Sequence, residues 1–160
     1  MRALPAGPTA VDMVANAALL VGLAEGLRGG IDRLLPSIPF HIAEYNFYRA
    51  AQHGLQAKLV WPRSDQYRLR ERPVSEIIHQ LLPVAREGLA ALNVSTPEID
   101  HYLGIIETRL SRGCTAADWQ LQAWRRLQEN RRSQHALHAM LDTFMVHSEE
   151  NLPIAEWPLP

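Results

Sequence analysis

The chain has 160 residues and a mass of 18.0 kDa, which is enough for a domain with its own hydrophobic core. Hydrophobic residues make up 47% of the chain and charged residues 21%, close to the average for globular proteins, and these values disfavour a disordered chain or a coiled coil. The formal net charge of −1 gives no overall attraction toward nucleic acid or an anionic membrane, and we expect neither as a partner.

The length of the apolar stretches and the scarcity of cysteine and lysine bound the function of the chain. The longest apolar stretch, residues 13–24, is interrupted by Asn16 and is too short to cross a bilayer, and no basic segment precedes it as in a signal peptide. The single cysteine, Cys114, cannot form an internal disulfide, which favours a cytoplasmic location. Lys58 is the only lysine, so the chain has no P-loop, and a lysine Schiff base could form only there.

The first part of the chain predicts a long apolar helix. Residues 1–8 are rich in proline and glycine and are interpreted as the stump of a preceding strand or loop. Thr9 is a candidate N-cap, and Asp12 follows three residues later as in a capping box. The helix is expected to run to about Arg28 and, being apolar on almost every face, to be buried on all sides.

The middle of the chain predicts two further helices joined by irregular structure. A helix is expected over residues 40–52, ended by Gly54. Residues 55–61 could form one short extended segment, and the polar, arginine-rich residues 62–72 indicate an exposed loop. The next helix is expected over residues 73–92.

The second half predicts three helices and a proline-rich tail. Ser95 is a candidate N-cap for a helix that ends at Gly113, and Thr115 is a candidate N-cap for the next. After a break near residues 130–133, a last helix has an apolar face formed by Leu137, Met140, Leu141 and Phe144. We therefore expect an all-α fold of five to six helices in an irregular bundle, with one domain over residues 9–150 and an extended tail over residues 151–160.

Two groups in the second half invite a functional interpretation. His135, His138 and Asp142 have a spacing that could suit metal ligands, but they lie opposite the apolar face of their helix, so we expect them in solvent and predict no metal site. Six arginines could instead form a phosphate or nucleic-acid surface, although a solvated face is the simpler interpretation. They are Arg109, Arg112, Arg125, Arg126, Arg131 and Arg132.

Cys114 lies at a helix start, where a thiolate is favoured. A cysteine nucleophile needs a base, and no histidine is close in the sequence, so we interpret Cys114 as a small, buried or half-buried residue.

Asn46, Arg49 and His53 share one face of the helix over residues 40–52. One interpretation is a polar face that forms hydrogen bonds with a neighbouring element. The other is an anion site, in which Arg49 makes bidentate contacts to a carboxylate or phosphate. The pattern alone does not choose between them.

Several segments resemble the C-terminal part of the carboxylate–amine ligases, the family that contains the type 2 glutamate–cysteine ligases. The resemblance covers nearly the whole chain, and its two most specific motifs are Pro-Thr-x-x-Asp and Asn-x-x-Arg-Ala-x-x-x-Gly-Leu. The first is formed by Pro8, Thr9 and Asp12, and the second by Asn46, Arg49, Ala50, Gly54 and Leu55. Supporting pieces are Leu81-Leu82-Pro83, the turn with Gly113 and Thr115, and Glu156-Trp157.

The resemblance implies a helical region that packs on a catalytic antiparallel sheet like that of glutamine synthetase. Such enzymes use ATP and Mg²⁺ to convert a carboxylate to an acyl phosphate, which an amine then attacks. The clustered carboxylates that hold the metal ions lie on strands that precede the region resembled here, and this sequence has no Glu-x-Glu strand. We therefore expect no catalytic residue and no cofactor in this chain alone. Met1 is then either an internal position of a longer ligase or the start of a free-standing remnant.

The resemblance also implies roles for individual residues. Arg2 would lie at the end of the last catalytic strand and face the substrate, and Asn46 and Arg49 would line the helix that backs the site. His53 stands where the family often has an aromatic or basic residue. Asp12 is expected to cap its helix. The partner of the chain would be the missing N-terminal catalytic part of the ligase.

Two other functions follow from the residues themselves. The apolar first helix suggests a non-enzymatic helical module for self-association or partner binding, because a small helical domain has difficulty covering such a surface. The arginines between positions 109 and 132 suggest a phosphate or nucleic-acid binder, which ranks last because no aromatic residues alternate with them as in a recognisable reading motif.

Overall fold

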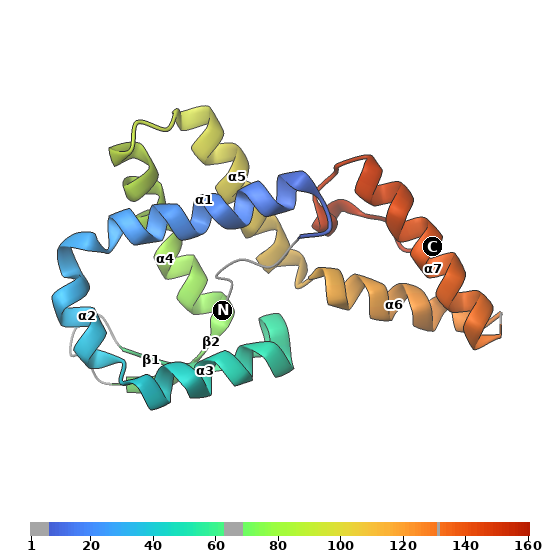
Figure 1. Cartoon of the computed structure of the whole chain (residues 1–160), viewed down its shortest axis with the longest axis horizontal. Coiled ribbons are helices and arrows are strands. Elements are labelled where there is room, and N and C mark those ends of the chain that lie inside the picture. Colours follow the sequence, from blue (N-terminus) through green and yellow to red (C-terminus); the bar gives the residue numbers. More distant parts are fainter. Residues whose placement is uncertain (1–6, 63–68, 131) are drawn as a thin grey trace. The chain divides into compact units, whose positions relative to one another are not determined.

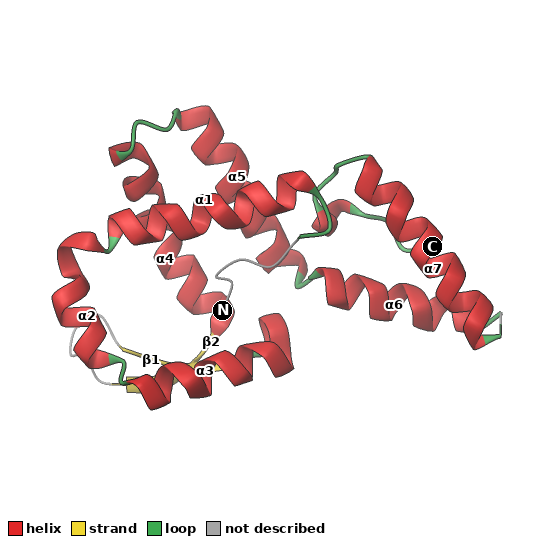
Figure 2. Ribbon diagram, viewed as in Figure 1, coloured by secondary structure: helices red, strands yellow, loops and turns green. Residues whose placement is uncertain are grey.

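The computed structural model describes residues 7–62, 69–130 and 132–160, which form mostly helices (Figure 1, Figure 2). Over these residues there are seven α-helices, three short 3-10 helices and one two-stranded sheet. The α-helices are α1 (Ala10–Gly26), α2 (Ile31–Ser37), α3 (Phe40–His53), α4 (Val74–Ala91), α5 (Thr96–Arg112), α6 (Ala116–Gln128) and α7 (Ser133–Glu149). The 3-10 helices are η1 (Arg28–Gly30), η2 (Gly54–Gln56) and η3 (Ile154–Glu156). The predicted all-α class is confirmed, with seven helices in place of five to six.

The chain divides into two compact units. The first contains Met1–Ala17 and Gly104–Pro160, and the second contains Ala18–Leu103, so α1 and α5 each contribute a segment to both units. The single domain expected over residues 9–150 includes residues of both units.

Helix α2 is not among the helices that the sequence predicted. It follows directly after Gly29 and Gly30, where the chain was expected to leave helical structure, and it contains Pro36. Proline lacks the backbone N–H and disturbs the preceding turn, so Pro36 deprives this helix of one hydrogen bond. Helix α2 is short and ends one residue later, at Ser37.

The expected exposed loop at residues 62–72 is wrong in part. Strand β1 (Lys58–Pro62) pairs antiparallel with strand β2 (Leu69–Pro73), with Lys58 opposite Pro73 and Pro62 opposite Leu69. The expected extended segment at residues 55–61 is one strand of this hairpin, and its partner strand has only Leu69 as a large apolar residue. A two-stranded ribbon needs no apolar alternation on both strands, and hydrophobic periodicity therefore missed β2. Residues 63–68 lie outside the described residues.

Within the second unit, α1 and α4 meet through their backbones. A methyl group added at Gly88 in α4 would collide with the carbonyl oxygen of Gly22 and would lie 2.6 Å from the backbone nitrogen of Gly26. A methyl group at Gly22 would likewise collide with the carbonyl oxygen of Ala85. The three glycines let the two helices approach more closely than ordinary side chains allow.

The expectation that α1 is buried on all sides is wrong. Ala15 and Gly22 are buried, whereas Val14, Leu20 and Val21 are exposed. The buried residues of α1 are Asp12, Ala15 and Gly22, and its larger apolar side chains are half-buried or exposed.

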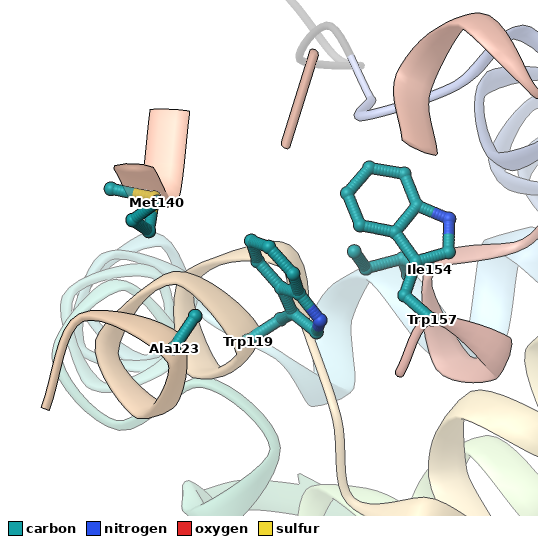
Figure 3. Close-up of a cluster of buried hydrophobic side chains, with 5 residues drawn as sticks. All are labelled: Trp119, Ala123, Met140, Ile154 and Trp157. Atoms are coloured by element: carbon teal, nitrogen blue, oxygen red, sulfur yellow. The ribbon is translucent and has the colours of Figure 1, made fainter. Parts of the chain in front are cut away.

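The core of the first unit is an aromatic cluster between α6, α7 and the C-terminal segment (Figure 3). Its buried members are Trp119, Ala123, Met140, Ile154 and Trp157. The Trp157 ring lies 5.3 Å from the Trp119 ring and 5.1 Å from the Phe144 ring, both edge to face. The indole nitrogen of Trp157 donates to the carbonyl oxygen of Leu152 (2.9 Å). Residues 151–160 were expected to lie extended over the surface, whereas they form η3 and bury Ile154 and Trp157 in this core.

The start of α6 agrees with the prediction from the sequence, whereas the apolar face of α7 agrees only in part. Thr115 caps α6: its hydroxyl accepts from the backbone N–H of Asp118, whose carboxylate accepts from the backbone N–H of Thr115. In α7 the expected apolar face is partly wrong, because Met140 is buried and Leu141 is exposed. Helix α7 has apolar residues on two faces, and the aromatic cluster covers only the face with Met140 and Phe144.

No single helix of the described residues is long and apolar enough to cross a membrane. Helix α1 and the segment Arg28–Ser37 reach the required length and composition only together, and they are bent by 44° at their junction.

Candidate functional site

The polar face of α3 contains the three residues that the sequence singled out. Asn46 lies against strand β1, where its Nδ2 donates to the carbonyl oxygen of Val60 (2.8 Å) and its Oδ1 accepts from the backbone N–H of Val60 (2.7 Å). Both ends of the side-chain amide are therefore used to hold β1 beside α3. Helix α3 then ends at Gly54, whose φ of +52° belongs to the left-handed region that favours glycine.

Arg49 lies one turn further along this face, and its guanidinium is surrounded by polar groups. Its Nη1 is 3.3 Å from Nε2 of His53, and its Nη2 is 3.9 Å from Oε1 of Glu71 in β2. The same Glu71 oxygen accepts from the hydroxyl of Tyr45 (3.4 Å). Because arginine only donates, a hydrogen bond between the two side chains requires Nε2 of His53 to accept. Glu71, which the sequence analysis did not single out, is thus the charge partner of Arg49.

The structure therefore brings Asn46, Arg49 and His53 together on one face of α3. Two of the three contact a neighbouring element, as the first interpretation expects: Asn46 binds Val60, and Arg49 pairs with Glu71. An anion bound by Arg49 would have to compete with Glu71. Glu71 lies on a strand that has no clear sequence signal, so this pairing could not be foreseen.

Replacing Asn46 by alanine is expected to lower the free energy of unfolding by about 1–2 kcal/mol. The change removes both hydrogen bonds to Val60 and leaves its partly buried backbone N–H and C=O without these partners. Urea unfolding followed by circular dichroism at 222 nm measures the effect. Gln52→Ala on the same helix, where the side chain is exposed, is the control. Equal stability of the two variants would contradict this role of Asn46.

A second polar cluster lies in the first unit, around the start of α1. The carboxylate of Asp12 is completely buried and accepts from the Thr9 hydroxyl (2.7 Å), from Nη2 of Arg109 (2.7 Å) and from the backbone N–H of Ile154 (3.0 Å). The other terminal nitrogen of Arg109 donates to Oδ1 of Asn16 (2.7 Å). Asp12 was singled out from the sequence only as a cap. In the structure it also joins α1 to α5 and to the C-terminal segment.

The six arginines of the second half do not form one common surface group. Arg109 binds Asp12, and Arg112 donates to the carbonyl oxygen of Ala155 (2.6 Å), so both are used inside the first unit. Arg125, Arg126 and Arg132 are exposed. Arg131 lies outside the described residues, as does Arg2.

The remaining candidates have ordinary surroundings. His135, His138 and Asp142 are exposed on α7, and no group of three or more His, Cys, Asp or Glu in the described residues could hold a metal ion. Cys114 is half-buried beside the aromatic cluster. Burial and the negative charge of Asp118 raise the pKa of its thiol, which disfavours the reactive thiolate.

Comparison of the chain with protein-family models, with curated proteins and with solved structures finds no match.

Proposed function

We propose that this chain is the helical C-terminal region of an ATP-dependent carboxylate–amine ligase resembling glutamate–cysteine ligase, and that it is inactive alone. The observation that supports this proposal is the use made of the two most specific motifs. Asp12 of the first motif joins three segments of the first unit, and Asn46 of the second motif holds the hairpin against α3. Both motifs thus provide structural joints, as expected of a region that supports a catalytic sheet.

The described residues do not fit the metal-bound nucleotide that such a ligase uses. Its Mg²⁺ ions need clustered carboxylates, and the acidic residues of the described chain are dispersed or paired with arginines. We therefore assign no phosphoryl-transfer step to these residues. Under this proposal the ATP and metal site belongs to the missing part. This chain contributes support and the side chains of Arg2 and Arg49, while Asn46 holds β1.

The proposal is tested by the DNA upstream of the Met1 codon and by an ADP-release assay. We expect an open reading frame that continues upstream and encodes acidic strand motifs. We also expect the longer protein, but not this chain, to release ADP from ATP and Mg²⁺ with glutamate and an amine. Release of ADP by this chain alone would overturn its inactivity. A stop codon and a ribosome-binding site directly upstream would overturn its place in a longer ligase.

A second function, self-association, is favoured by the surfaces of α2 and α3. Neither helix buries a residue, and α3 exposes Phe40, Tyr45, Phe47 and Tyr48. Monomeric proteins seldom leave such an apolar patch uncovered. A chain that sediments as a monomer at every concentration and binds no hydrophobic dye would exclude this function.

A further inference from the structure

The outer face of α3 has the spacing of a helix-pairing seam. Phe40, Ala43, Phe47 and Ala50 follow one another at intervals of three, four and three residues, and we call these four residues the α3 seam. All four are exposed, Phe40 by 81% and Phe47 by 52%. The hairpin lies beside the seam, where Asn46, three residues after Ala43 and four before Ala50, binds β1. The seam itself is thus an apolar stripe that no described element of the second unit covers.

The sizes of the seam residues alternate, and this alternation suits a second copy of the same helix. Residues 40 and 50 are equally far from position 45, and so are residues 43 and 47. An antiparallel copy of α3, related by a two-fold axis at the level of Tyr45, therefore places Phe40 opposite Ala50 and Phe47 opposite Ala43. Each large side chain then meets a small one at all four levels of the seam. A parallel copy would place phenylalanine against phenylalanine and alanine against alanine, which leaves gaps at the alanines.

We infer that α3 pairs antiparallel with α3 of a second copy of this chain through the α3 seam. This inference rests on the self-association proposed above and names its surface and its partner. The contact is isologous, because the same residues face each other from both copies, so it closes as a dimer and does not extend into a fibre.

The size of the seam predicts a weak dimer. If a fully buried phenylalanine covers about 200 Å², the exposed parts of Phe40 and Phe47 amount to about 500 Å² for both copies together. Stable interfaces bury about 1,600 Å², so we expect a dissociation constant of about 100 μM.

Glu44 borders the seam one residue from the axis, so the Glu44 side chains of the two copies lie on the same side and repel each other. Glu44→Gln is therefore expected to tighten the dimer about twofold.

The pairing is tested by sedimentation equilibrium up to about 1 mM protein, far enough above the expected dissociation constant to populate the dimer. Phe47→Ala removes the phenylalanine, and Ala43→Phe places two phenylalanines opposite each other. We expect each change to weaken the dimer about tenfold. The double variant Ala43→Phe with Phe47→Ala exchanges the two sizes and is expected to return the dissociation constant to within about threefold of the wild-type value. Gln52→Ala, at an exposed position of α3 outside the seam, is the control and should leave the dimer unchanged.

Each outcome supports or overturns a definite part of the inference. A dimer that the double variant restores supports the antiparallel register. A dimer that is insensitive to these changes would show that the chain associates elsewhere, and would overturn the α3 seam but not self-association. A wild-type chain that remains monomeric at the highest concentration would overturn both. The changed side chains are exposed, and circular dichroism of each variant shows whether its helices are retained.

Discussion

Replacing Asp12 by alanine is expected to lower the free energy of unfolding by about 3–5 kcal/mol, the cost of removing one partner of a buried ion pair. The Asp12 carboxylate is completely buried, and the side chain of Arg109 that it binds is only 16% exposed. Without the carboxylate, the guanidinium stays largely buried without its counter-charge. The backbone N–H of Ile154 and the hydroxyl of Thr9 lose their acceptor as well.

The effect of Asp12→Ala is measured by urea unfolding, followed by tryptophan fluorescence. Three of the four tryptophans, Trp119, Trp124 and Trp157, lie in the same unit as Asp12 and report its unfolding. Glu150→Ala is the matched control, because Glu150 lies in the same unit and also pairs with a basic side chain, that of His147, but is well exposed. Exposed ion pairs contribute about 0–1 kcal/mol. If the two variants lost the same stability, the Asp12 cluster would not hold the first unit together.

The features that could be predicted from the sequence are those that depend on near neighbours. The start of α6 follows from Thr115 and Asp118, which lie three residues apart and bind each other as a capping box. At the start of α5, the Glu98 carboxylate accepts from the hydroxyl and the backbone N–H of Ser95, three residues before it. Their hydrogen bonds lower the pKa of Glu98 below its usual value. Such signals need only one turn of helix, so they survive any arrangement of the rest of the chain.

The features that could not be predicted depend on partners that are distant along the chain. Asp12 appears as a cap, whereas its contacts with Arg109 and Ile154 span 97 and 142 residues. The prolines of the tail suggest an extended surface segment, but Trp157 gains more by packing on Trp119 and Phe144 than by remaining in solvent. At the candidate site, the shared face of Asn46 and Arg49 could be predicted. Their partners, Val60 and Glu71, depend on a hairpin with little apolar periodicity.

Replacing Gly88 by alanine is expected to lower the free energy of unfolding by about 3 kcal/mol, near the upper end for the insertion of one methyl group. The new methyl group would collide with the carbonyl oxygen of Gly22 and lie 2.6 Å from the nitrogen of Gly26. Both are backbone atoms, so no side-chain rotation relieves the contact, and α1 and α4 would have to move apart. This loss outweighs the gain of about 0.5–1 kcal/mol that alanine brings to a helix interior.

Gly104→Ala separates these two effects, because Gly104 is also inside a helix, α5, but a methyl group there meets no atom within 4 Å. This control is expected to raise the free energy of unfolding by about 0.5–1 kcal/mol through helix propensity alone. The midpoint temperature of thermal unfolding, followed by circular dichroism at 222 nm, should therefore fall for Gly88→Ala and rise for Gly104→Ala. If Gly88→Ala also stabilised the chain, α1 and α4 would not be in backbone contact, and the glycines at positions 22, 26 and 88 would need another explanation.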